Sequence, residues 1–353
     1  LDVVLAARGG LALIEGEPGI GKTRFLSEVA ADAYWRGMDV IWGRSLHDGG
    51  GPYAPLTEAL ISGLTPLRAQ QLAQRLEPVW LRQLAHLVPT LRNTRATGSP
   101  EQRPLRPADE QARMMESITL AFCTLADISP LMVVLDDMHW ADNDTVQALA
   151  HLSARTESHR LLVAVSYRHT DARDRSEVWA LLRALSQRPS CTRISLTPCS
   201  LPQTEHLVRS CLGLPNVTSE LARRVFRETG GVPLLVVEAL RGQREHGHIA
   251  EIGSGYGQKC RGLGRSSLSV ELRTLLRHRL DGLPVEARAV LDLLSVHDGE
   301  LTLAEIVAAL DFQDAAVLRG IDNVTQRHLL VGQSGRDQLS HELLRRVLYD
   351  DLP

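Results

Sequence analysis

The feature that most constrains this chain is a glycine-rich segment that lies between an apolar run and an amphipathic stretch. Residues 16–23 read Gly-Glu-Pro-Gly-Ile-Gly-Lys-Thr and fit G-x-x-x-x-G-K-[ST] at every fixed position. The run Leu11–Ile14 predicts a buried strand, and the apolar spacing from Thr23 to Trp35 predicts a helix. A strand, a glycine-rich loop and a helix in this order are the context in which the pattern marks a phosphate-binding loop.

The loop predicts contacts with ATP or ADP and with Mg²⁺. Its glycines let backbone N–H groups point at phosphate oxygens, and the positive end of the following helix adds to this attraction. We expect Lys22 to bridge the β- and γ-phosphates and Thr23 to offer its hydroxyl to Mg²⁺. Lys22 and Lys259 are the only lysines among 39 basic residues, which marks Lys22 as unusual. The expected nucleotide contacts are Gly16, Glu17, Pro18, Gly19, Ile20, Gly21, Lys22, Thr23 and Arg24.

Two later strands predict the rest of the site. The apolar run Leu131–Leu135 ends at Asp136 and Asp137. We expect Asp136 to hold Mg²⁺ through water, and Asp137 to polarise the attacking water or to read the γ-phosphate. The run Leu161–Tyr167 delivers Arg168 to the carboxyl edge of the sheet, where ligands of parallel sheets bind. Arg168 could contact the γ-phosphate or stabilise charge in the transition state, although its position also fits an ordinary surface arginine.

The order of elements predicts an α/β fold with a parallel sheet and helices on both faces, as in a P-loop NTPase of the ASCE or AAA-like type. Apolar strands alternate with helical stretches up to about residue 197, and helices dominate afterwards. Helices from 272 to 323 and a hairpin at 329–340 suggest a winged helix. The expected parts are a nucleotide-binding domain (1–200), a helical lid (201–246), a glycine-rich linker (247–268) and a winged-helix-like domain (269–353).

Composition narrows the remaining possibilities. Hydrophobic residues make up 44% of the chain and charged residues 23%, and these fractions exclude a disordered chain. The formal net charge of -3 gives no global attraction for nucleic acid or an anionic membrane. Five cysteines without C-x-x-C spacing suggest neither a disulfide framework nor a zinc site, so the cytoplasm fits best. No apolar run approaches the roughly 18 residues that a membrane span needs. The chain lacks an initiator Met, and we expect it to be a fragment of a longer protein.

Further segments carry a resemblance to a known family. After the loop come residues 131–142 (Leu-Met-Val-Val-Leu-Asp-Asp-Met-His-Trp-Ala-Asp), Tyr167-Arg168 and residues 229–234 (Thr-Gly-Gly-Val-Pro-Leu). Two more are residues 51–56 (Gly-Pro-Tyr-Ala-Pro-Leu) and 339–345 (Leu-Ser-His-Glu-Leu-Leu-Arg). With these, the sequence resembles the signal-transduction ATPases with numerous domains (STAND). It is most similar to the ATPase module of large bacterial LuxR-type regulators related to the maltose regulator, and of cyclase-linked relatives.

The resemblance implies an ATP-dependent switch in which the α/β domain and lid enclose ADP or ATP and a winged helix closes over the nucleotide. It implies that Pro233 packs against adenine and that Arg168 senses the γ-phosphate. His341 stands where the winged-helix histidine of eukaryotic relatives touches the β-phosphate, although a packed or capping histidine is the alternative. The chain departs from the family at Val232, where Asn is usual, so any polar contact from that side chain is lost.

No residue of the sequence stands out as an arginine finger, so we expect slow hydrolysis, or hydrolysis only on assembly. We also expect self-assembly, or binding of a protein partner, in the ATP-bound state. We expect DNA binding only through domains outside this stretch, because residues 271–352 hold nine Arg, no Lys and fourteen acidic residues. Two alternatives stay open. One is a constitutive P-loop ATPase or kinase, which phosphate transfer to a small metabolite would favour. The other is a DNA-loading AAA ATPase, which salt-dependent DNA affinity would favour.

Overall fold

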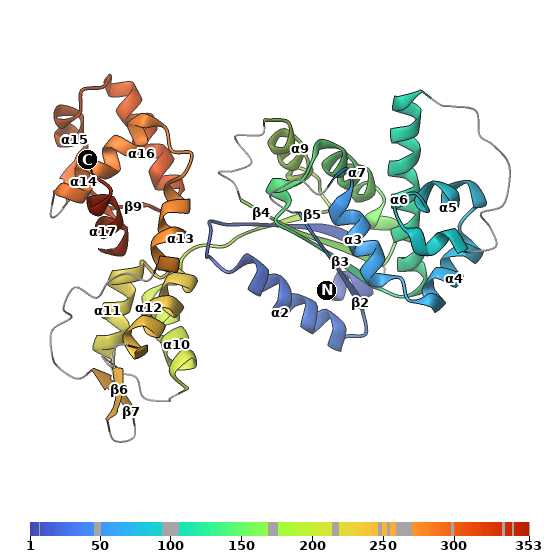
Figure 1. Ribbon diagram of the computed structural model, residues 1–353, viewed down its shortest axis with the longest axis horizontal. Coiled ribbons are helices and arrows are strands. Elements are labelled where there is room, and N and C mark those ends of the chain that lie inside the picture. Colours follow the sequence, from blue (N-terminus) through green and yellow to red (C-terminus); the bar gives the residue numbers. More distant parts are fainter. Residues whose placement is uncertain are drawn as a thin grey trace. The chain divides into compact units, whose positions relative to one another are not determined.

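The computed structural model falls into two compact units. The first comprises residues 1–16 and 22–196, and the second comprises residues 17–21 and 197–353. The structure describes residues 1–6, 8–45, 51–93, 106–168, 176–213, 219–245, 249–252, 255–258, 270–297, 300–333, 336–340 and 342–352. Figure 1 shows the elements of both units.

The first unit is built on a five-stranded parallel sheet with the order β2-β3-β4-β1-β5. Its strands are β1 (Gly10–Glu15), β2 (Asp39–Arg44), β3 (Leu131–Asp136), β4 (Leu161–Tyr167) and β5 (Cys191–Ser195). All six residues of β3 are buried, because a central parallel strand is covered on both faces. The α/β architecture expected from the sequence is confirmed.

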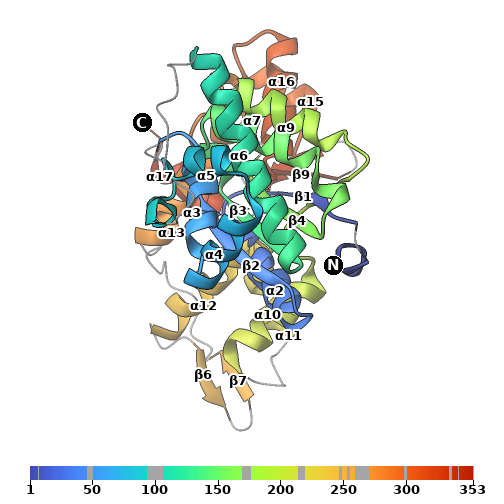
Figure 2. The same ribbon diagram turned by 90° about the vertical axis from the view of Figure 1, so that its right-hand side faces the viewer.

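Helices cover the two faces of this sheet. The helices of the first unit are α1 (Asp2–Leu5), α2 (Lys22–Trp35), α3 (Ala54–Gly63), α4 (Pro66–Arg75), α5 (Pro78–Leu84), α6 (Pro107–Ile128), α7 (Asn143–Ser153) and α9 (Ser176–Ser186). Successive strand residues point to opposite faces, so Met132 and Val134 pack with α2 while Val133 and Leu135 pack with α6 and α7. Figure 1 shows α2 on one side of the sheet and α3, α7 and α9 on the other. In Figure 2, α4 and α5 lie against α6.

The second unit is mostly helical. Its elements are α10 (Leu201–Leu212), α11 (Ser219–Thr229), α12 (Pro233–Glu245), β6 (Ile249–Ile252), β7 (Gly255–Gln258), α13 (Val270–Leu280), α14 (Val285–Val296), β8 (Leu301–Thr302), α15 (Leu303–Ala309), α16 (Asp314–Gln326), β9 (Leu330–Gln333), β10 (Arg336–Leu339) and α17 (Glu342–Asp350). The last three strands form a small antiparallel sheet in the order β8-β10-β9. Val236 and Leu240 of α12 pack with α10 and α11, whereas Leu235 joins the core formed by α13–α17. Helix α12 therefore connects the two hydrophobic cores of this unit.

Two features concern the domain boundaries expected from the sequence. Strands β6 and β7 form an antiparallel pair inside the segment 247–268, for which the sequence suggested a linker. The first unit ends at Leu196, and residues 197–353 belong to one unit together with residues 17–21. The division of residues 201–353 into a lid, a linker and a final domain stays a prediction. No helix among the described residues is long and apolar enough to cross a membrane.

Candidate functional site

The phosphate-binding loop leaves β1 and enters α2, as its sequence pattern predicts. Gly19 and Gly21 have φ angles of 78° and 101°, a region where a side chain would strain the backbone. The N–H of Ile20 donates to the carbonyl of Glu17 at 3.3 Å and closes a tight turn. Lys22 is 7% exposed, and its Nζ donates to the carbonyl oxygen of Gly16 at 2.8 Å. The lysine therefore folds back over the start of the loop, and its amine is held where the chain turns.

Asp136 at the end of β3 is the centre of a buried hydrogen-bond network. Its Oδ2 accepts from Thr23 Oγ1 at 2.8 Å and from Arg44 Nη2 at 3.2 Å. Its Oδ1 accepts from the hydroxyl of Ser166 and from the N–H of Asp137 at 3.1 Å. Asp136 is 1% exposed, so these four donors hold a charged group away from water. The predicted pair of Mg²⁺ ligands, Thr23 and Asp136, is thus in direct contact.

The Thr23–Asp136 pair is suited to Mg²⁺. One hydroxyl and one carboxylate supply oxygen ligands, and Mg²⁺ usually takes one or two carboxylates while water and phosphate oxygens fill the remaining positions. No cluster of three or more His, Cys, Asp or Glu side chains that could hold a metal occurs in the described part of the chain. The two oxygen donors present therefore fit a Mg²⁺ ion whose remaining ligands are water and phosphate oxygens.

Asp137 has an unusual backbone and a perturbed carboxyl group. Its φ of 58° places it in the left-handed region, which aspartate tolerates better than most residues. Its N–H donates to Ser166 Oγ at 2.9 Å. Burial, and then the charge of Asp136, raise the pKa of the Asp137 carboxyl, while Arg168, Lys22 and Arg44 oppose that rise. Asp137 therefore lies within the field of three cations and beside a second carboxylate.

Glu15, the last residue of β1, is fixed by groups from β4 and β5. Tyr167 Oη and Arg193 Nη2 each donate to its carboxylate at 2.8 Å, and the hydroxyl of Ser195 donates as well. Burial raises the pKa of Glu15, but these hydrogen bonds outweigh burial and lower the pKa overall. The residue that precedes the loop is therefore anchored to the two strands that flank β1.

The structure places the other predicted contacts as follows. Arg168 follows β4 and acts electrostatically on Asp137. The side chain of Arg24 is 81% exposed and pairs with Glu28 at 2.5 Å. Pro233 begins α12. His341 lies outside the described residues. Arg168, Arg24, Pro233 and His341 stay predicted nucleotide contacts.

The tip of the loop, residues 17–21, packs within the second unit. The carbonyl oxygen of Gly19 accepts from the N–H of Leu234 at 3.2 Å. A Cβ on Gly19 would lie 3.1 Å from the Cβ of Leu234 and 3.6 Å from Val232. The Gly-Gly-x-Pro segment is itself braced, because the carbonyl of Gly231 accepts from the N–H of Cys199 at 2.9 Å. The segment singled out in the sequence therefore contacts the phosphate-binding loop directly.

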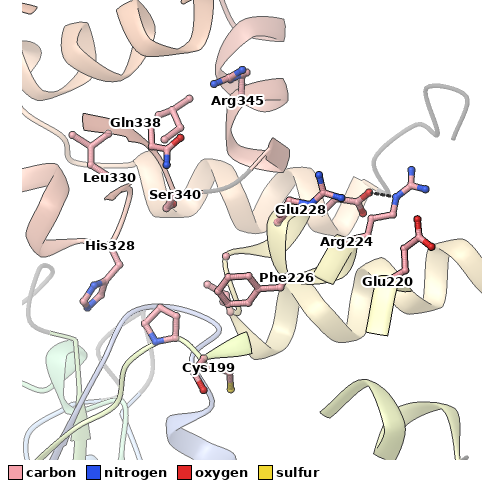
Figure 3. Close-up of a pocket in the computed structure, with 16 residues that line it drawn as sticks. Cys199, Glu220, Arg224, Phe226, Glu228, His328, Leu330, Gln338, Ser340 and Arg345 are labelled. Carbon is pink, nitrogen blue, oxygen red and sulfur yellow. Dashed lines mark hydrogen bonds and ion pairs between the residues drawn. The ribbon is translucent and has the colours of Figure 1, made fainter. Parts of the chain in front are cut away.

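The second unit also contains a cavity of about 990 Å³. Figure 3 shows Phe226, Arg224 and Glu228 of α11 on one wall and residues of the β9–β10 hairpin on another. Glu228 accepts from Arg224 Nε at 3.0 Å, so two of the charged groups on the wall neutralise one another. Val232 of the Gly-Gly-x-Pro segment lines the same cavity.

Sequence reasoning missed Arg44 and Ser166. Arg44 ends β2 in register with Asp136, so the argument that singled out Arg168 at a strand end also applied to Arg44. Ser166 is the polar residue in an otherwise apolar strand, which was a usable signal. The sequence did not show which carboxylate Ser166 contacts, because that depends on the strand order, in which β4 lies between β1 and β3.

Comparisons with known proteins agree with this geometry. The family model described as AAA ATPase domain matches residues 1–164. Residues 1–164 are therefore similar to the AAA ATPase domain. The match covers the loop, Asp136 at the end of β3, Asp137 after it, and the first four residues of β4. No curated protein matches the chain.

Two solved structures from Pyrococcus species are similar to the whole chain. A Walker-type ATPase of Pyrococcus abyssi is 12% identical with a TM-score of 0.53, and the alignment covers 98% of this chain and 93% of that one. A STAND protein with a tetratricopeptide repeat sensor from Pyrococcus horikoshii is 15% identical with a TM-score of 0.36. That alignment covers 100% of this chain and 42% of the longer protein. The first similarity shows a shared fold.

Proposed function

We propose that this chain is the nucleotide-controlled switch of a regulatory protein of the STAND type. In this proposal the AAA ATPase domain binds ATP or ADP with Mg²⁺ and hydrolyses ATP slowly, and the bound nucleotide controls the packing of the second unit. The observation that carries the proposal is the double role of residues 17–21. They belong to the phosphate-binding motif, yet they pack within the second unit through the Gly19–Leu234 hydrogen bond.

The contacts at the loop support this coupling. A phosphate group that enters the loop needs inward-pointing N–H groups and the amine of Lys22. Lys22 Nζ donates to the Gly16 carbonyl, and this bond holds the amine at the start of the loop. Any rearrangement of the loop tip also acts on the N–H of Leu234 and therefore on α12. Because α12 contributes residues to both hydrophobic cores of the second unit, a displacement of α12 on nucleotide binding would change the packing of both cores.

We assign the chemistry to the residues at the sheet edge. Thr23 and Asp136 would hold Mg²⁺, which when bound neutralises charge on the phosphates. The raised pKa of Asp137 suits a group that accepts a proton from the attacking water, because a base works best when its pKa approaches the working pH. Arg168 would read the γ-phosphate. Among the groups of the second unit, Pro233 would meet adenine and His341 the β-phosphate.

The wider role rests on the resemblance to LuxR-type and cyclase-linked regulators. The proposal includes a winged-helix-like arrangement for residues 269–353, for which the helices α13–α17 and the small β8-β10-β9 sheet are suitable. It also includes self-assembly or binding of a protein partner in the ATP state, and location in the cytoplasm. We assign DNA binding to domains outside this stretch, because residues 271–352 carry nine Arg, no Lys and fourteen acidic residues.

Nucleotide binding to the Lys22→Ala variant tests the site. We expect the wild-type chain to bind fluorescent ADP and ATP in the presence of Mg²⁺, and Lys22→Ala to lose that binding. Arg36→Ala is a matched control, because Arg36 is a cation just beyond the far end of the same helix and pairs with Asp2 and Asp32 on the surface. Unchanged ATP affinity in Lys22→Ala would refute the site assignment.

Turnover of the wild-type chain tests the switch. A switch holds ADP tightly and turns over well below the median enzyme rate of about 10 s⁻¹. Phosphate release is measured with and without ADP preincubation, and ADP retention is measured by its dissociation rate. Rapid hydrolysis without any partner would favour a constitutive ATPase over a switch.

A further inference from the structure

One of the four donors that hold the buried carboxylate of Asp136 is charged. Thr23, Ser166 and the amide of Asp137 are neutral donors. Arg44, by contrast, reaches Asp136 Oδ2 with its guanidinium at 3.2 Å. The side chain of Asp136 is 1% exposed and that of Arg44 is 53% exposed. A buried carboxylate without a cation is costly, so Arg44 supplies the positive charge that Asp136 needs.

The backbone of Arg44 is fixed on both sides, whereas its guanidinium is not enclosed. Strand β2 ends at Arg44 in register with Asp136, and the next amide, that of Ser45, donates to the carbonyl of Asp136 at 3.0 Å. On the other side α3 comes close to β2, and a Cβ on Gly43 would lie 1.8 Å from the carbonyl oxygen of Pro55. The half-exposed side chain of Arg44 can therefore move while the strand end that carries it stays in place.

A second carboxylate lies beside Arg44. The amide of Arg44 donates to Glu58 Oε2 at 2.7 Å, and Glu58 is an exposed residue of α3. Because this carboxylate contacts the backbone of Arg44, the flexible side chain of Arg44 can also reach it. A carboxylate has about four acceptor positions, so Glu58 can keep the amide and still accept a guanidinium. Arg44 therefore has one carboxylate partner in the core and a second one at the surface.

Mg²⁺ would compete with Arg44 for one oxygen of Asp136. Oδ1 accepts from Ser166 and from the amide of Asp137, which leaves Oδ2, the oxygen next to Thr23, for the ion or its bound water. Arg44 donates to this same Oδ2. A bound divalent ion is often the largest local charge in a site, and Mg²⁺ also needs near-ideal octahedral geometry. Like charges repel strongly where water is scarce, so the guanidinium and Mg²⁺ exclude one another at Oδ2.

We propose that Arg44 is a positioning residue that yields the Asp136 carboxylate to Mg²⁺. Arg44 pairs with Asp136 before the nucleotide binds and turns to Glu58 when the nucleotide brings Mg²⁺. The inference rests on the proposed function, and it names the residue that sets the Mg²⁺ requirement of that function. Removal of Arg44 has two effects of opposite sign, because the ion-free fold becomes less stable while Mg²⁺ binds more tightly. A residue that only supported the shape of the site would weaken both.

Magnesium titrations of Arg44→Gln test this exchange. The probe is fluorescent ATP, and the quantity measured is the Mg²⁺ concentration at half-maximal ATP binding. Glutamine keeps a donor for Asp136 but removes the charge, so we expect this concentration to fall about tenfold, within the usual range for coupled sites. Arg44→Lys keeps the charge and should stay close to wild type. An unchanged or higher Mg²⁺ concentration in Arg44→Gln would overturn the inference, and so would ATP binding by the wild-type chain that does not depend on Mg²⁺.

Thermal melting of Arg44→Gln measures the other half of the exchange. In EDTA without nucleotide, the variant should melt below wild type, and Mg²⁺ with ATP should reduce that difference because the ion replaces the lost charge. An equal difference in melting temperature under both conditions would contradict the exchange. The control is Arg68→Gln, because Arg68 pairs with Asp39 at the opposite end of β2. This control also removes an arginine–aspartate pair, and it should leave the Mg²⁺ requirement unchanged.

Glu58→Gln tests the second partner of Arg44. The amide oxygen of glutamine can still accept the N–H of Arg44, so the variant removes only the charge. Arg44 then leaves Asp136 less readily, and the half-maximal Mg²⁺ concentration should rise about threefold, as for the loss of an exposed ion pair. The rise should be absent in the Arg44→Gln background, and an equal rise in both backgrounds would overturn the role of Glu58. If Arg44→Gln fails to fold, an unchanged Mg²⁺ requirement in Glu58→Gln alone would overturn the exchange.

The outcomes separate this inference from the proposed function. Lys22-dependent ATP binding by the wild-type chain, with an unchanged Mg²⁺ requirement in the Arg44 and Glu58 variants, would overturn the exchange and still support the switch. Absence of Lys22-dependent binding in the wild-type chain would refute the proposed function itself. A lower Mg²⁺ requirement of Arg44→Gln together with its lower melting temperature in EDTA supports the inference.

Discussion

Replacing Ser166 by alanine tests how the buried aspartate of β3 is held. Ser166 is fully buried, donates to Asp136 Oδ1 and accepts the N–H of Asp137 at 2.9 Å. In Ser166→Ala the Asp137 amide keeps Asp136 Oδ1 as acceptor at 3.1 Å, and Thr23 and Arg44 still bind Oδ2. The net loss is one hydrogen bond to a charged group, which is typically about 1.5–3 kcal/mol. We take about 2 kcal/mol as the expected loss of unfolding free energy.

Urea unfolding measures this loss. The transition midpoint should fall while the slope stays the same, because the variant changes stability and not the surface exposed on unfolding. In thermal melting, 1 kcal/mol corresponds to about 2–4 °C for a unit of 150–250 residues, so the expected shift in Tm is about 4–8 °C. The Mg²⁺ concentration needed for half-maximal ATP binding should also increase, because Asp136 is less well oriented in the variant.

Ser186→Ala is the matched control for this experiment. The Ser186 hydroxyl bonds to the carbonyl of Arg183 in its own helix, and its removal should change stability by less than about 0.5 kcal/mol. If Ser166→Ala is as stable as Ser186→Ala, the hydrogen bond to Asp136 does not stabilise the fold as argued.

Three further predictions concern backbone geometry and pH. Gly231→Ala should lower the free energy of unfolding by several times the roughly 1 kcal/mol expected for Gly213→Ala. Both glycines have φ above 70°, but only at Gly231 would a Cβ lie 2.0 Å from the carbonyl oxygen of Cys199. Equal melting temperatures of the two variants would contradict this reasoning. Asp137→Asn should be more stable than wild type at pH 7, since the raised pKa makes the charged carboxyl unfavourable in the fold. This advantage should shrink as the pH falls through the raised pKa toward 3.8, and it should change no further below 3.8. Glu15→Gln should be less stable than wild type at pH 7, and this difference in stability should shrink as the pH falls from 4.5 through the lowered pKa. Urea unfolding midpoints of the Asp137 and Glu15 variants and of wild type, measured between pH 3 and 7 in steps of about 0.5, check the direction of each pH dependence.

Local pattern in the sequence predicted the central strand, the backbone of the glycine-rich loop and one contact at the sheet edge. The fully apolar run at 131–135 predicted a doubly covered strand, and β3 is buried along its whole length. The glycine-rich motif predicted its own backbone, because φ values of 78° and 101° at Gly19 and Gly21 are conformations that glycine adopts without strain. The identity of Asp136 as the carboxylate nearest Thr23 also followed from motif and strand order along the chain.

The tertiary structure alone decided which distant groups meet. The placement of β4 between β1 and β3 brings Ser166 to Asp136 and Tyr167 to Glu15, and no local pattern encodes that neighbour relation. Periodicity reports only which face of an element is apolar, whereas the charge that a buried group meets is set by the elements that fold against it.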